Sequence, residues 1–254
     1  MLRANKLTMN RQGNILLDNV SCEIGANQLV ALVGHNGSGK STLIKALAGE
    51  MTSSSGSITL DDTAISDYGS KELACQMAYL PQQLPEAAGF TVRELVMLGR
   101  YPHQKWLQKP TAIDKEKVAQ AMKVTQVEPF ADRITATLSG GERARAWLAM
   151  CLAQDTRYLL LDEPLAALDM HYQIEVIQLI RRLVDEQGLS VVIIIHDINL
   201  AAQYADRVVA LKKGQVCHNG DVSSTMQPEV LHDIFNVDMQ LLKHPVTGQP
   251  VAVA

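Results

Sequence analysis

The feature that most restricts the fold of this chain is a glycine-rich loop, Gly34–Ser41, with the pattern G-x-x-x-x-G-K-[ST]. The apolar run LVALV precedes the loop, and the run KSTLIKALAG follows it and ends in Gly49. This order predicts a buried strand, a turn and then a helix. Glycines let consecutive backbone N–H groups surround a phosphate, and the helix N-terminus adds the positive end of its dipole. The chain is therefore expected to have an α/β nucleotide-binding fold.

The side chains of this loop suit a nucleoside triphosphate and Mg²⁺. Lys40 is expected to reach the β- and γ-phosphates, and the Ser41 hydroxyl is expected to ligate Mg²⁺. A glycine-rich turn that arose by chance would not have its strand and helix in register. The expected ATP-binding residues are Gly34, His35, Asn36, Gly37, Ser38, Gly39, Lys40, Ser41 and Thr42.

Composition narrows the setting in which the chain works. It has 254 residues with 27 acidic and 23 basic side chains, a net charge of −4, which argues against a nucleic-acid binder held by overall charge. The four cysteines are scattered without a C-x-x-C pair, which argues against disulfides and a zinc site. Free cysteines of this kind are typical of a reducing, cytosolic compartment. The N-terminus lacks the layout of a secretory signal, and the longest aliphatic run, Val191–Ile195, is too short to cross a bilayer. Any link to a membrane is expected to pass through a partner.

Apolar, β-branched runs alternate with helical patterns along most of the chain. SITLDD, MAYLPQ, YLLLDEP and SVVIIIHD are further candidate strands, and the last two are apolar enough to be covered on both faces of a parallel sheet. Three helical patterns and no convincing strand occur between residues 85 and 155. We expect one domain over residues 1–254, with an α/β core at 1–86 and 156–254 and an inserted helical subdomain at 87–155. A hairpin around Lys213-Gly214 and a short helix at Pro228–Phe235 are expected near the end.

Polar residues follow several of these strands. Asp162 and Glu163 come at the end of YLLL, where ligands of open α/β sheets bind. Asp162 is a candidate anchor for Mg²⁺, and Glu163 is a candidate to polarise an attacking water. His196 follows VVIII and Gln82 follows MAYLP; each is unremarkable alone, but together they deliver several polar groups to one sheet edge.

A second glycine pair begins another helix, in the stretch LSGGE. Ser139 and Glu142 form a capping box, and an apolar-periodic helix follows. A well-capped helix would explain the box, but Gly140 and Gly141 each cost about 1 kcal/mol relative to alanine within a helix. Glycines leave the first N–H groups accessible, so the pattern predicts a second anion site, this one without a lysine or Mg²⁺ ligands.

These motifs together resemble the ATPase subunits of ABC transporters over essentially the whole chain. The resemblance rests on GHNGSGKST, Gln82, LSGGE, YLLLDEP, LAALD with Asp169, and His196 in IIHD. It implies an ABC-type P-loop ATPase with a RecA-like, mostly parallel sheet, an N-terminal antiparallel β region and an inserted helical subdomain. It also implies a homodimer that holds two ATP molecules head to tail. Each ATP would lie between the phosphate loop of one subunit and the LSGGE stretch of the other, which is called the signature.

The resemblance further implies a role for each motif. Glu163 would be the catalytic base, His196 would contact the γ-phosphate, and Asp169 would join the two sites across the dimer. Gln82 would touch Mg²⁺ and the attacking water while sensing the membrane subunit. The implied metal ligands are Ser41, Gln82 and Asp162, and the implied contacts to the partner's ATP are Ser139, Gly140, Gly141 and Glu142.

Three positions depart from the family pattern. Glu142 stands where glutamine is common, and Leu165 stands where threonine is frequent. The family usually stacks an aromatic side chain on adenine, but there is none in Met9–Gly13. Two possibilities stay open there: Arg11 stacks on the base, or the base is loosely held.

Phrases outside the phosphate motifs resemble one subfamily, the ATPases of iron–siderophore importers and most closely those for ferric hydroxamates. These phrases are TVRELVMLGRYPH, SGGERARAWLAM, HDINLAAQYADRVVALKKG and HPVTGQP. The resemblance implies a peripheral subunit on the cytoplasmic face of a bacterial inner membrane, with an integral permease and a periplasmic siderophore-binding protein as partners. The segment from Gln82 to about Arg100 would receive the permease. Haem and cobalamin importers share this architecture and remain alternatives.

Two other function classes are weaker. A soluble ABC-type ATPase acting on ribosomes or DNA usually carries two ATPase domains, coiled-coil arms or zinc inserts, and this chain has one domain, no heptad run and no cysteine cluster. A small-molecule kinase would use the same phosphate loop but would leave LSGGE and His196 unexplained.

Overall fold

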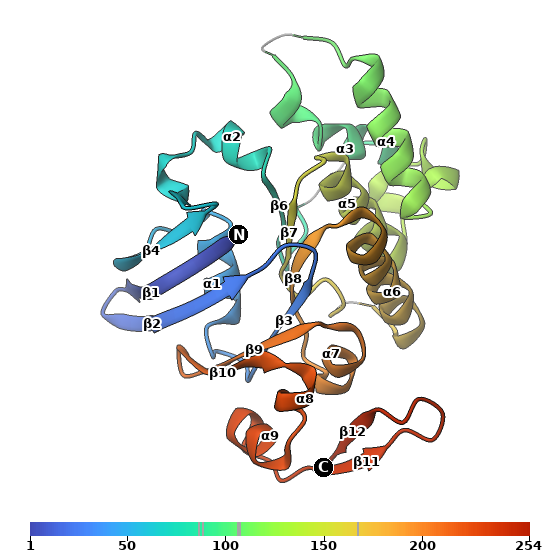
Figure 1. Ribbon diagram of the computed structural model, residues 1–254. Coiled ribbons are helices and arrows are strands. Elements are labelled where there is room, and N and C mark those ends of the chain that lie inside the picture. The colour runs from blue at the N-terminus through green and yellow to red at the C-terminus, as the bar shows by residue number, and fades with distance from the viewer. Residues whose placement is uncertain (86, 88, 106–107, 167) are drawn as a thin grey trace. The chain divides into compact units, whose positions relative to one another are not determined.

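The computed structural model describes residues 1–85, 87, 89–105, 108–166 and 168–254, which form two compact units. The first unit combines residues 1–67 with 184–254, and the second comprises residues 68–183. Figure 1 labels their elements. Among the described residues, no helix is both long and apolar enough to cross a membrane.

The first unit contains an antiparallel sheet and a group of parallel strands. The antiparallel sheet has the order β2-β1-β4-β5, with β1 at Leu2–Arg11, β2 at Asn14–Ile24, β4 at Ser55–Leu60 and β5 at Thr63–Ala64. Strand β3, Leu29–Val33, pairs in parallel with both β8, Ser190–Ile194, and β9, Arg207–Lys212. Strand β10, Gln215–Asp221, forms the expected hairpin with β9 around Lys213 and Gly214.

Every residue of β3 and of β8 is buried. Burying one such aliphatic side chain contributes about 1.5–3 kcal/mol, so the apolar runs that predict these strands also hold the unit together. Four helices complete the unit: α1 at Lys40–Leu47, α7 at Ile198–Tyr204, α8 at Val222–Thr225 and α9 at Pro228–Phe235. A final hairpin pairs β11, Gln240–Lys243, with β12, Pro250–Val253.

The second unit contains one parallel strand pair and most of the helices expected from the sequence. Strands β6, Met77–Leu80, and β7, Tyr158–Leu161, run parallel, and all four residues of β7 are buried. Helix α2 spans Ser70–Ala74, α3 spans Val92–Leu98, α4 spans Ala112–Val124 and α5 spans Gly140–Ala153. Helix α6, Met170–Gln187, begins in this unit. The described part of residues 85–155 contains helices and no strand, as the sequence indicated.

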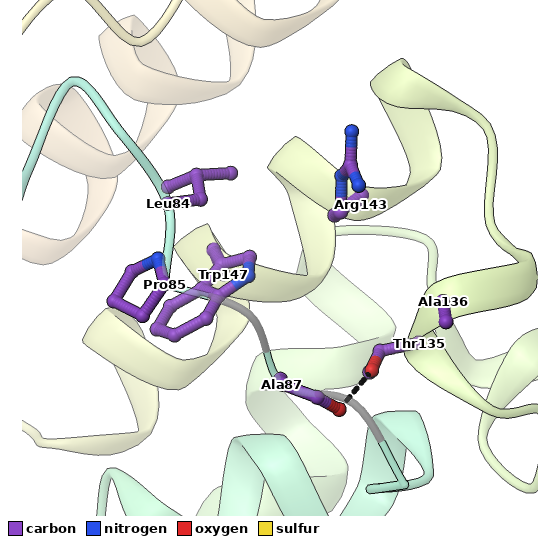
Figure 2. A pocket seen from close by; sticks show the side chains of 7 residues that line it. All are labelled: Leu84, Pro85, Ala87, Thr135, Ala136, Arg143 and Trp147. Carbon is purple, nitrogen blue, oxygen red and sulfur yellow. Dashed lines mark hydrogen bonds between the residues drawn. The ribbon is translucent and has the colours of Figure 1, made fainter.

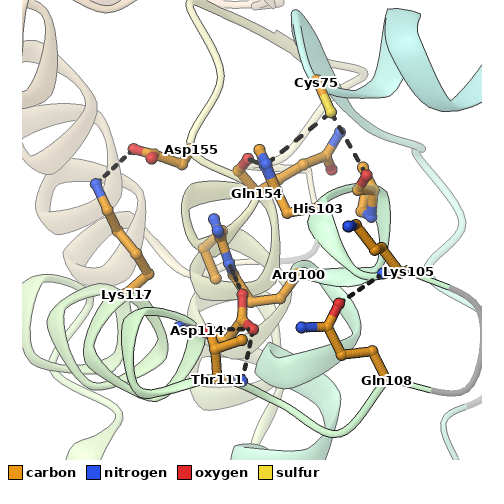
Figure 3. Close-up of polar contacts among 12 residues, drawn as sticks. Cys75, Arg100, His103, Lys105, Gln108, Thr111, Asp114, Lys117, Gln154 and Asp155 are labelled. Atoms are coloured by element: carbon orange, nitrogen blue, oxygen red, sulfur yellow. Dashed lines mark hydrogen bonds and ion pairs between the residues drawn. The ribbon is translucent and has the colours of Figure 1, made fainter.

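A buried ion pair ties three of these helices together (Figure 3). Arg100 follows α3, and its Nε lies 3.0 Å from Oδ1 of Asp114 in the first turn of α4. The same guanidinium donates through Nη1 to the carbonyl of Ala153, the last residue of α5, at 2.7 Å. The side chains of Arg100 and Asp114 are only 4% and 5% exposed. Since a buried charge must be paired and hydrogen-bonded to be tolerated, this contact fixes the end of α5 to α4.

Candidate functional site

The phosphate loop connects β3 to α1, as the sequence predicted. Its glycines Gly34, Gly37 and Gly39 have φ values of 133°, 76° and 106°, a region that side chains with a Cβ rarely adopt. At Gly34 a Cβ would also lie 2.2 Å from the carbonyl oxygen of Leu211. Gly39 is the N-cap of α1 and offers no side chain to cap it. The loop therefore exposes a helix N-terminus whose first N–H groups are not capped by a side chain.

Lys40 turns its amine back over the loop. The Nζ atom donates to the carbonyl oxygens of Gly34 at 2.8 Å and His35 at 2.9 Å, and the side chain is buried. The Ser38 hydroxyl is also buried and has no hydrogen-bond partner among the described residues. A buried hydroxyl without a partner is costly unless a polar group binds to it, and the loop also carries a lysine amine, so this loop suits an anion. His35, Asn36 and Gly37 are exposed.

His196 comes from the strand beside β3. Strands β3 and β8 pair in parallel, with Leu29 opposite Val191 and Leu32 opposite Ile194, so the loop and His196 leave the same ends of neighbouring strands. His196 is exposed, and the next residue, Asp197, caps α7 by accepting from two backbone N–H groups. The first unit thus brings the phosphate loop and His196 to one edge of the parallel strands.

The acidic pair follows β7 in the second unit. The Asp162 N–H donates to the Leu80 carbonyl at 2.9 Å, which continues the β6–β7 pairing. The Asp162 carboxylate is fully buried and accepts from the Tyr79 hydroxyl at 3.3 Å. Asp162 is therefore a buried carboxyl group that is held in place, the kind of group that binds a metal ion or pairs with a cation.

Glu163 and Gln82 lie in direct contact after the neighbouring strands β7 and β6, a pairing that the sequence did not specify. Gln82 Nε2 donates to Glu163 Oε2 at 2.7 Å. Glu163 has a φ of 51°, an uncommon conformation for a residue with a side chain. Such a conformation costs free energy and persists only where the surrounding structure holds it, as is often the case at functional sites.

The second glycine pair begins α5 with the expected capping box. The Ser139 hydroxyl accepts from the Glu142 N–H at 3.3 Å, and Glu142 Oε2 accepts from the Ser139 N–H at 2.8 Å. The Ser139 N–H, followed by the Ser139 hydroxyl and the positive charges of Arg133 and Arg145, outweighs burial and lowers the pKa of Glu142. Glu142 is therefore held as a carboxylate at neutral pH.

The structure adds a residue that the sequence did not single out, Tyr172. A Cβ at Gly141 would lie 3.0 Å from the Tyr172 ring, so glycine lets that ring pack directly on the start of α5. Tyr172 is in the first turn of α6, where its N–H donates to Asp169 Oδ1 at 3.1 Å. Arg145 of α5 lies over the same ring, with its guanidinium 5.5 Å from the Tyr172 ring centre. No local pattern indicates this contact, because it joins two helices about 30 residues apart in the sequence.

The structure also gives the positions of the other residues that the sequence singled out. Arg11 is exposed at the end of β1, and Thr42 and Ser41 lie in the first turn of α1. Leu165 is buried and its carbonyl accepts from Gln173 at 3.1 Å. The first unit holds the phosphate loop and His196, and the second holds Gln82, Asp162, Glu163, Asp169 and the signature residues.

A hollow of about 280 Å³ lies between the segment after Gln82 and the first turns of α5 (Figure 2). The Trp147 ring lies beside Leu84 and Pro85 at one end of the hollow. The Thr135 hydroxyl donates to the Ala87 carbonyl at 2.7 Å and links the two walls. The full lining is Leu84, Pro85, Ala87, Thr135, Ala136, Arg143 and Trp147.

A phosphate loop after a buried parallel strand, an acidic pair after another such strand, and a capped glycine pair define a P-loop ATPase. The chain belongs to the ABC transporter family, whose model matches residues 17–166. It is an ABC-type ATPase that binds ATP, and the expected fold class is confirmed.

Three relatives match nearly the whole chain. The petrobactin import ATP-binding protein FpuD of Bacillus anthracis is 39% identical and covers 99% of this chain and 92% of its own length. The hemin import ATP-binding protein HmuV of Rhodococcus jostii is 42% identical, with coverages of 97% and 84%. The iron(3+)-hydroxamate import ATP-binding protein FhuC of Bacillus subtilis is 38% identical, with coverages of 94% and 89%.

Two solved structures share the fold. An inward-facing metal-chelate type ABC transporter has a TM-score of 0.85 and 25% identity, over 100% of this chain and 97% of that one. A dimeric ATP-binding cassette in a post-hydrolysis state, bound to ADP and Pi, has a TM-score of 0.77 and 27% identity, over 87% and 99% of the two chains.

Proposed function

We propose that this chain is the ATP-hydrolysing subunit of a bacterial ferric-siderophore importer, bound to the cytoplasmic face of the inner membrane through an integral permease. The observation that carries the proposal is the full-length similarity to import ATP-binding proteins whose named cargoes are iron chelates. The phosphate loop and the acidic pair supply the matching chemistry. A periplasmic siderophore-binding protein would be an indirect partner, and the cargo itself would not touch this chain.

The residues of the two motifs fit ATP and Mg²⁺. The uncapped start of α1 and the buried Lys40 amine offer backbone N–H groups and a positive charge to the phosphates. Hydroxyl, amide and carboxylate oxygens are the donors that Mg²⁺ prefers, and Ser41, Gln82 and the buried Asp162 supply one of each. Bound Mg²⁺ would neutralise charge that develops on the phosphates.

Glu163 would take the proton of the attacking water. Its carboxylate is oriented by the 2.7 Å hydrogen bond from Gln82, and the unusual backbone conformation sets the direction of the side chain. Gln82 follows β6, the strand that pairs with β7, and Glu163 follows β7. Gln82 also begins the segment that leads to the hollow in Figure 2. A shift of that segment would therefore change the orientation of the base.

The signature would complete the site of a second copy of the chain. Its capping box positions the Ser139 hydroxyl at the start of α5, and Gly140 and Gly141 leave room for a phosphate to approach the backbone. His196 would contact the γ-phosphate within its own chain, and Asp169 would contact the partner. ATP binding would then close the dimer, and hydrolysis would open it.

The hollow between the Gln82 segment and α5 would receive a cytoplasmic helix of the permease. It combines the exposed Pro85 and the half-buried Leu84 with the largely buried Trp147. The charged side chain of Arg143 lies at the same hollow, and the nearby Phe90 is 42% exposed. An exposed apolar surface next to a charged side chain is suited to a protein partner.

The ATPase part of the proposal is tested by measuring phosphate release with and without Mg²⁺, using purified chain alone and reconstituted with its permease. We expect hydrolysis that requires Mg²⁺, is abolished by Lys40→Ala and rises when the permease is present. Mg²⁺-dependent hydrolysis that the permease leaves unchanged would contradict the transport assignment, even though the chain would remain an ATPase.

The cargo is tested in a deletion strain by growth and by uptake of radioactive iron. We expect loss of growth on ferric hydroxamate siderophores as the sole iron source and recovery with the wild-type gene. Haem is a second candidate cargo because a hemin import protein is 42% identical to this chain. Growth lost on haem but retained on hydroxamates would assign the chain to haem import instead.

A further inference from the structure

The C-terminal hairpin has no part in the proposed function, although its turn carries the distinctive sequence HPVTGQP. The imidazole of His244 organises this turn: its Nδ1 accepts from the backbone N–H groups of Val246 and Thr247, each at 3.2 Å. The His244 N–H donates to the Gln249 carbonyl at 2.8 Å, and Gly248 supplies the required positive φ of 72°. The turn therefore sets the register in which β12 returns alongside β11.

That register directs one backbone unit of β12 towards α7. Ala252 pairs with Leu241 of β11 and is 8% exposed. Its N–H donates to Asn199 Oδ1 at 2.8 Å, and its carbonyl accepts from Asn199 Nδ2 at 3.0 Å. An amide side chain presents a donor and an acceptor side by side, so Asn199 pairs with Ala252 as a neighbouring strand would.

Asn199 is also part of the cap of α7. Its backbone N–H donates to Asp197 Oδ1 at 2.8 Å, and the Leu200 N–H donates to the same oxygen at 3.3 Å. One residue thus joins the hairpin through its side chain and the N-cap through its backbone. The cap directly follows His196, which lies three positions before Asn199.

Helix α7 needs such an anchor because it is only seven residues long. A helix of two turns is not stable in water on its own, and its N-terminus opens readily unless tertiary contacts hold it. His196 is exposed and lies between the end of β8 and this short helix. Its position therefore depends on how firmly the start of α7 is held.

We propose that the C-terminal hairpin positions His196 for the γ-phosphate by holding the first turn of α7 through the Asn199–Ala252 amide pair. Asn199 is a positioning residue in this scheme, since it acts through the cap and not on the nucleotide. The inference rests on the proposed role of His196 in ATP hydrolysis. It assigns a function to the HPVTGQP turn, which fixes the register that brings Ala252 to Asn199.

The test compares Asn199→Leu with wild type in the full-length chain. Leucine keeps the size of the side chain but cannot form the two hydrogen bonds. We expect kcat for ATP hydrolysis to fall about tenfold, while the KM for ATP stays within twofold. Amide hydrogen exchange in residues 196–204 should become faster, and exchange in the phosphate loop should be unchanged. His244→Ala should give a smaller change in the same direction.

Val246→Ser is the matched control, because Val246 is in the same turn and its side chain is 87% exposed. It should leave kcat and exchange at wild-type values. The inference is wrong if Asn199→Leu keeps the wild-type kcat and exchange, or if kcat and KM change together with exchange across the whole chain. Failure of the proposed function is separate: His196→Ala would then hydrolyse ATP at the wild-type rate.

Discussion

At the scale of single residues, Glu163 combines a backbone conformation that is unfavourable for a side-chain-bearing residue with a hydrogen bond that orients its carboxylate. A left-handed conformation costs about 1–2 kcal/mol for such a residue, and it persists only where the surrounding structure holds it. Here β7 and its pairing with β6 hold the preceding residue, Asp162, and Gln82 holds the side chain. The strained backbone is what we expect if the proposed reaction requires one particular orientation of the Glu163 carboxylate.

Replacing Glu163 by Gln should separate ATP binding from hydrolysis. The amide has the shape of the carboxylate but cannot accept a proton, so turnover should fall by a factor of about 100 or more. The affinity for ATP should stay within a few-fold of wild type, because the phosphate loop is untouched. Phosphate release and equilibrium ATP binding measure the two effects. The exposed Glu186→Gln is the control, and a Glu163→Gln enzyme with wild-type turnover would exclude Glu163 as the base.

Gly141 should not tolerate alanine, despite lying in a helix. Alanine would normally favour the helix by about 1 kcal/mol, but its Cβ would come within 3.0 Å of the Tyr172 ring. We expect Gly141→Ala to lower both the urea midpoint and ATP turnover. Adding Tyr172→Ala should remove the clash and restore the urea midpoint to that of Tyr172→Ala alone or above it. Gly69→Ala, where a Cβ meets nothing within 4 Å, is the control. A stabilised Gly141→Ala single variant would show that the ring yields without cost.

At the scale of elements, the packing of α3, α4 and α5 depends on the buried Arg100–Asp114 pair. Burial alone would raise the pKa of Asp114, but hydrogen bonds from the Thr111 backbone and hydroxyl and from Arg100 outweigh burial and lower it. A lowered carboxyl pKa contributes stability that is fully present above the unfolded-state pKa and is lost as pH falls through the folded-state value.

Asp114→Asn should therefore destabilise the chain in a pH-dependent way. Removing one charge of a buried pair leaves the other uncompensated, so we expect a loss of about 3 kcal/mol in the free energy of unfolding at pH 7. The difference between variant and wild type should be constant above the unfolded-state pKa of an aspartate, about 4, and should shrink as pH falls from there through the lower folded-state pKa of Asp114. Urea unfolding at several pH values measures this. Asp132→Asn, which breaks the exposed pair with Arg93, should cost less than about 1 kcal/mol. A pH-independent difference for Asp114→Asn would contradict the ionic account.

The elements also show which parts of the molecule can be predicted from sequence. Local patterns predicted β3, α1, the β9–β10 hairpin and α9, because apolar runs, glycine turns and a proline at the helix start act within a few residues. The sequence placed Gln82 and Glu163 after strands that end at one sheet edge, but it did not give the hydrogen bond between them. The sequence did not predict the contacts of Tyr172 with Gly141 and of Asn199 with Ala252, because each joins elements distant in sequence through side chains that are ordinary in their own helices. The four-residue strands β11 and β12 are too short to give a periodic signal.

At the scale of the whole molecule, the signature and the phosphate loop are two proposed anion sites of different composition. The loop comes with a buried lysine, whereas the start of α5 offers a hydroxyl, two glycines and a carboxylate that caps the helix. A single chain that hydrolysed ATP alone would need only the first of them. The presence of both is explained if the signature of each chain serves the nucleotide of another copy, as in a symmetric head-to-tail pair.

Mixing two inactive variants should then restore activity. Lys40→Ala removes the phosphate-loop cation, and Ser139→Arg blocks the signature, so neither variant alone builds a complete site. In a mixed pair, the intact loop of one chain faces the intact signature of the other. Random pairing at equal concentrations makes half of the pairs mixed, each with one complete site of two, so we expect about a quarter of wild-type ATP turnover. Trapping of labelled ATP should show one nucleotide per mixed pair. As a control, Lys40→Ala mixed with the double variant Lys40→Ala/Ser139→Arg has no intact loop and should remain inactive. If the first mixture is no more active than its separate components and traps no ATP, each reaction centre lies within one chain and the head-to-tail pair is wrong.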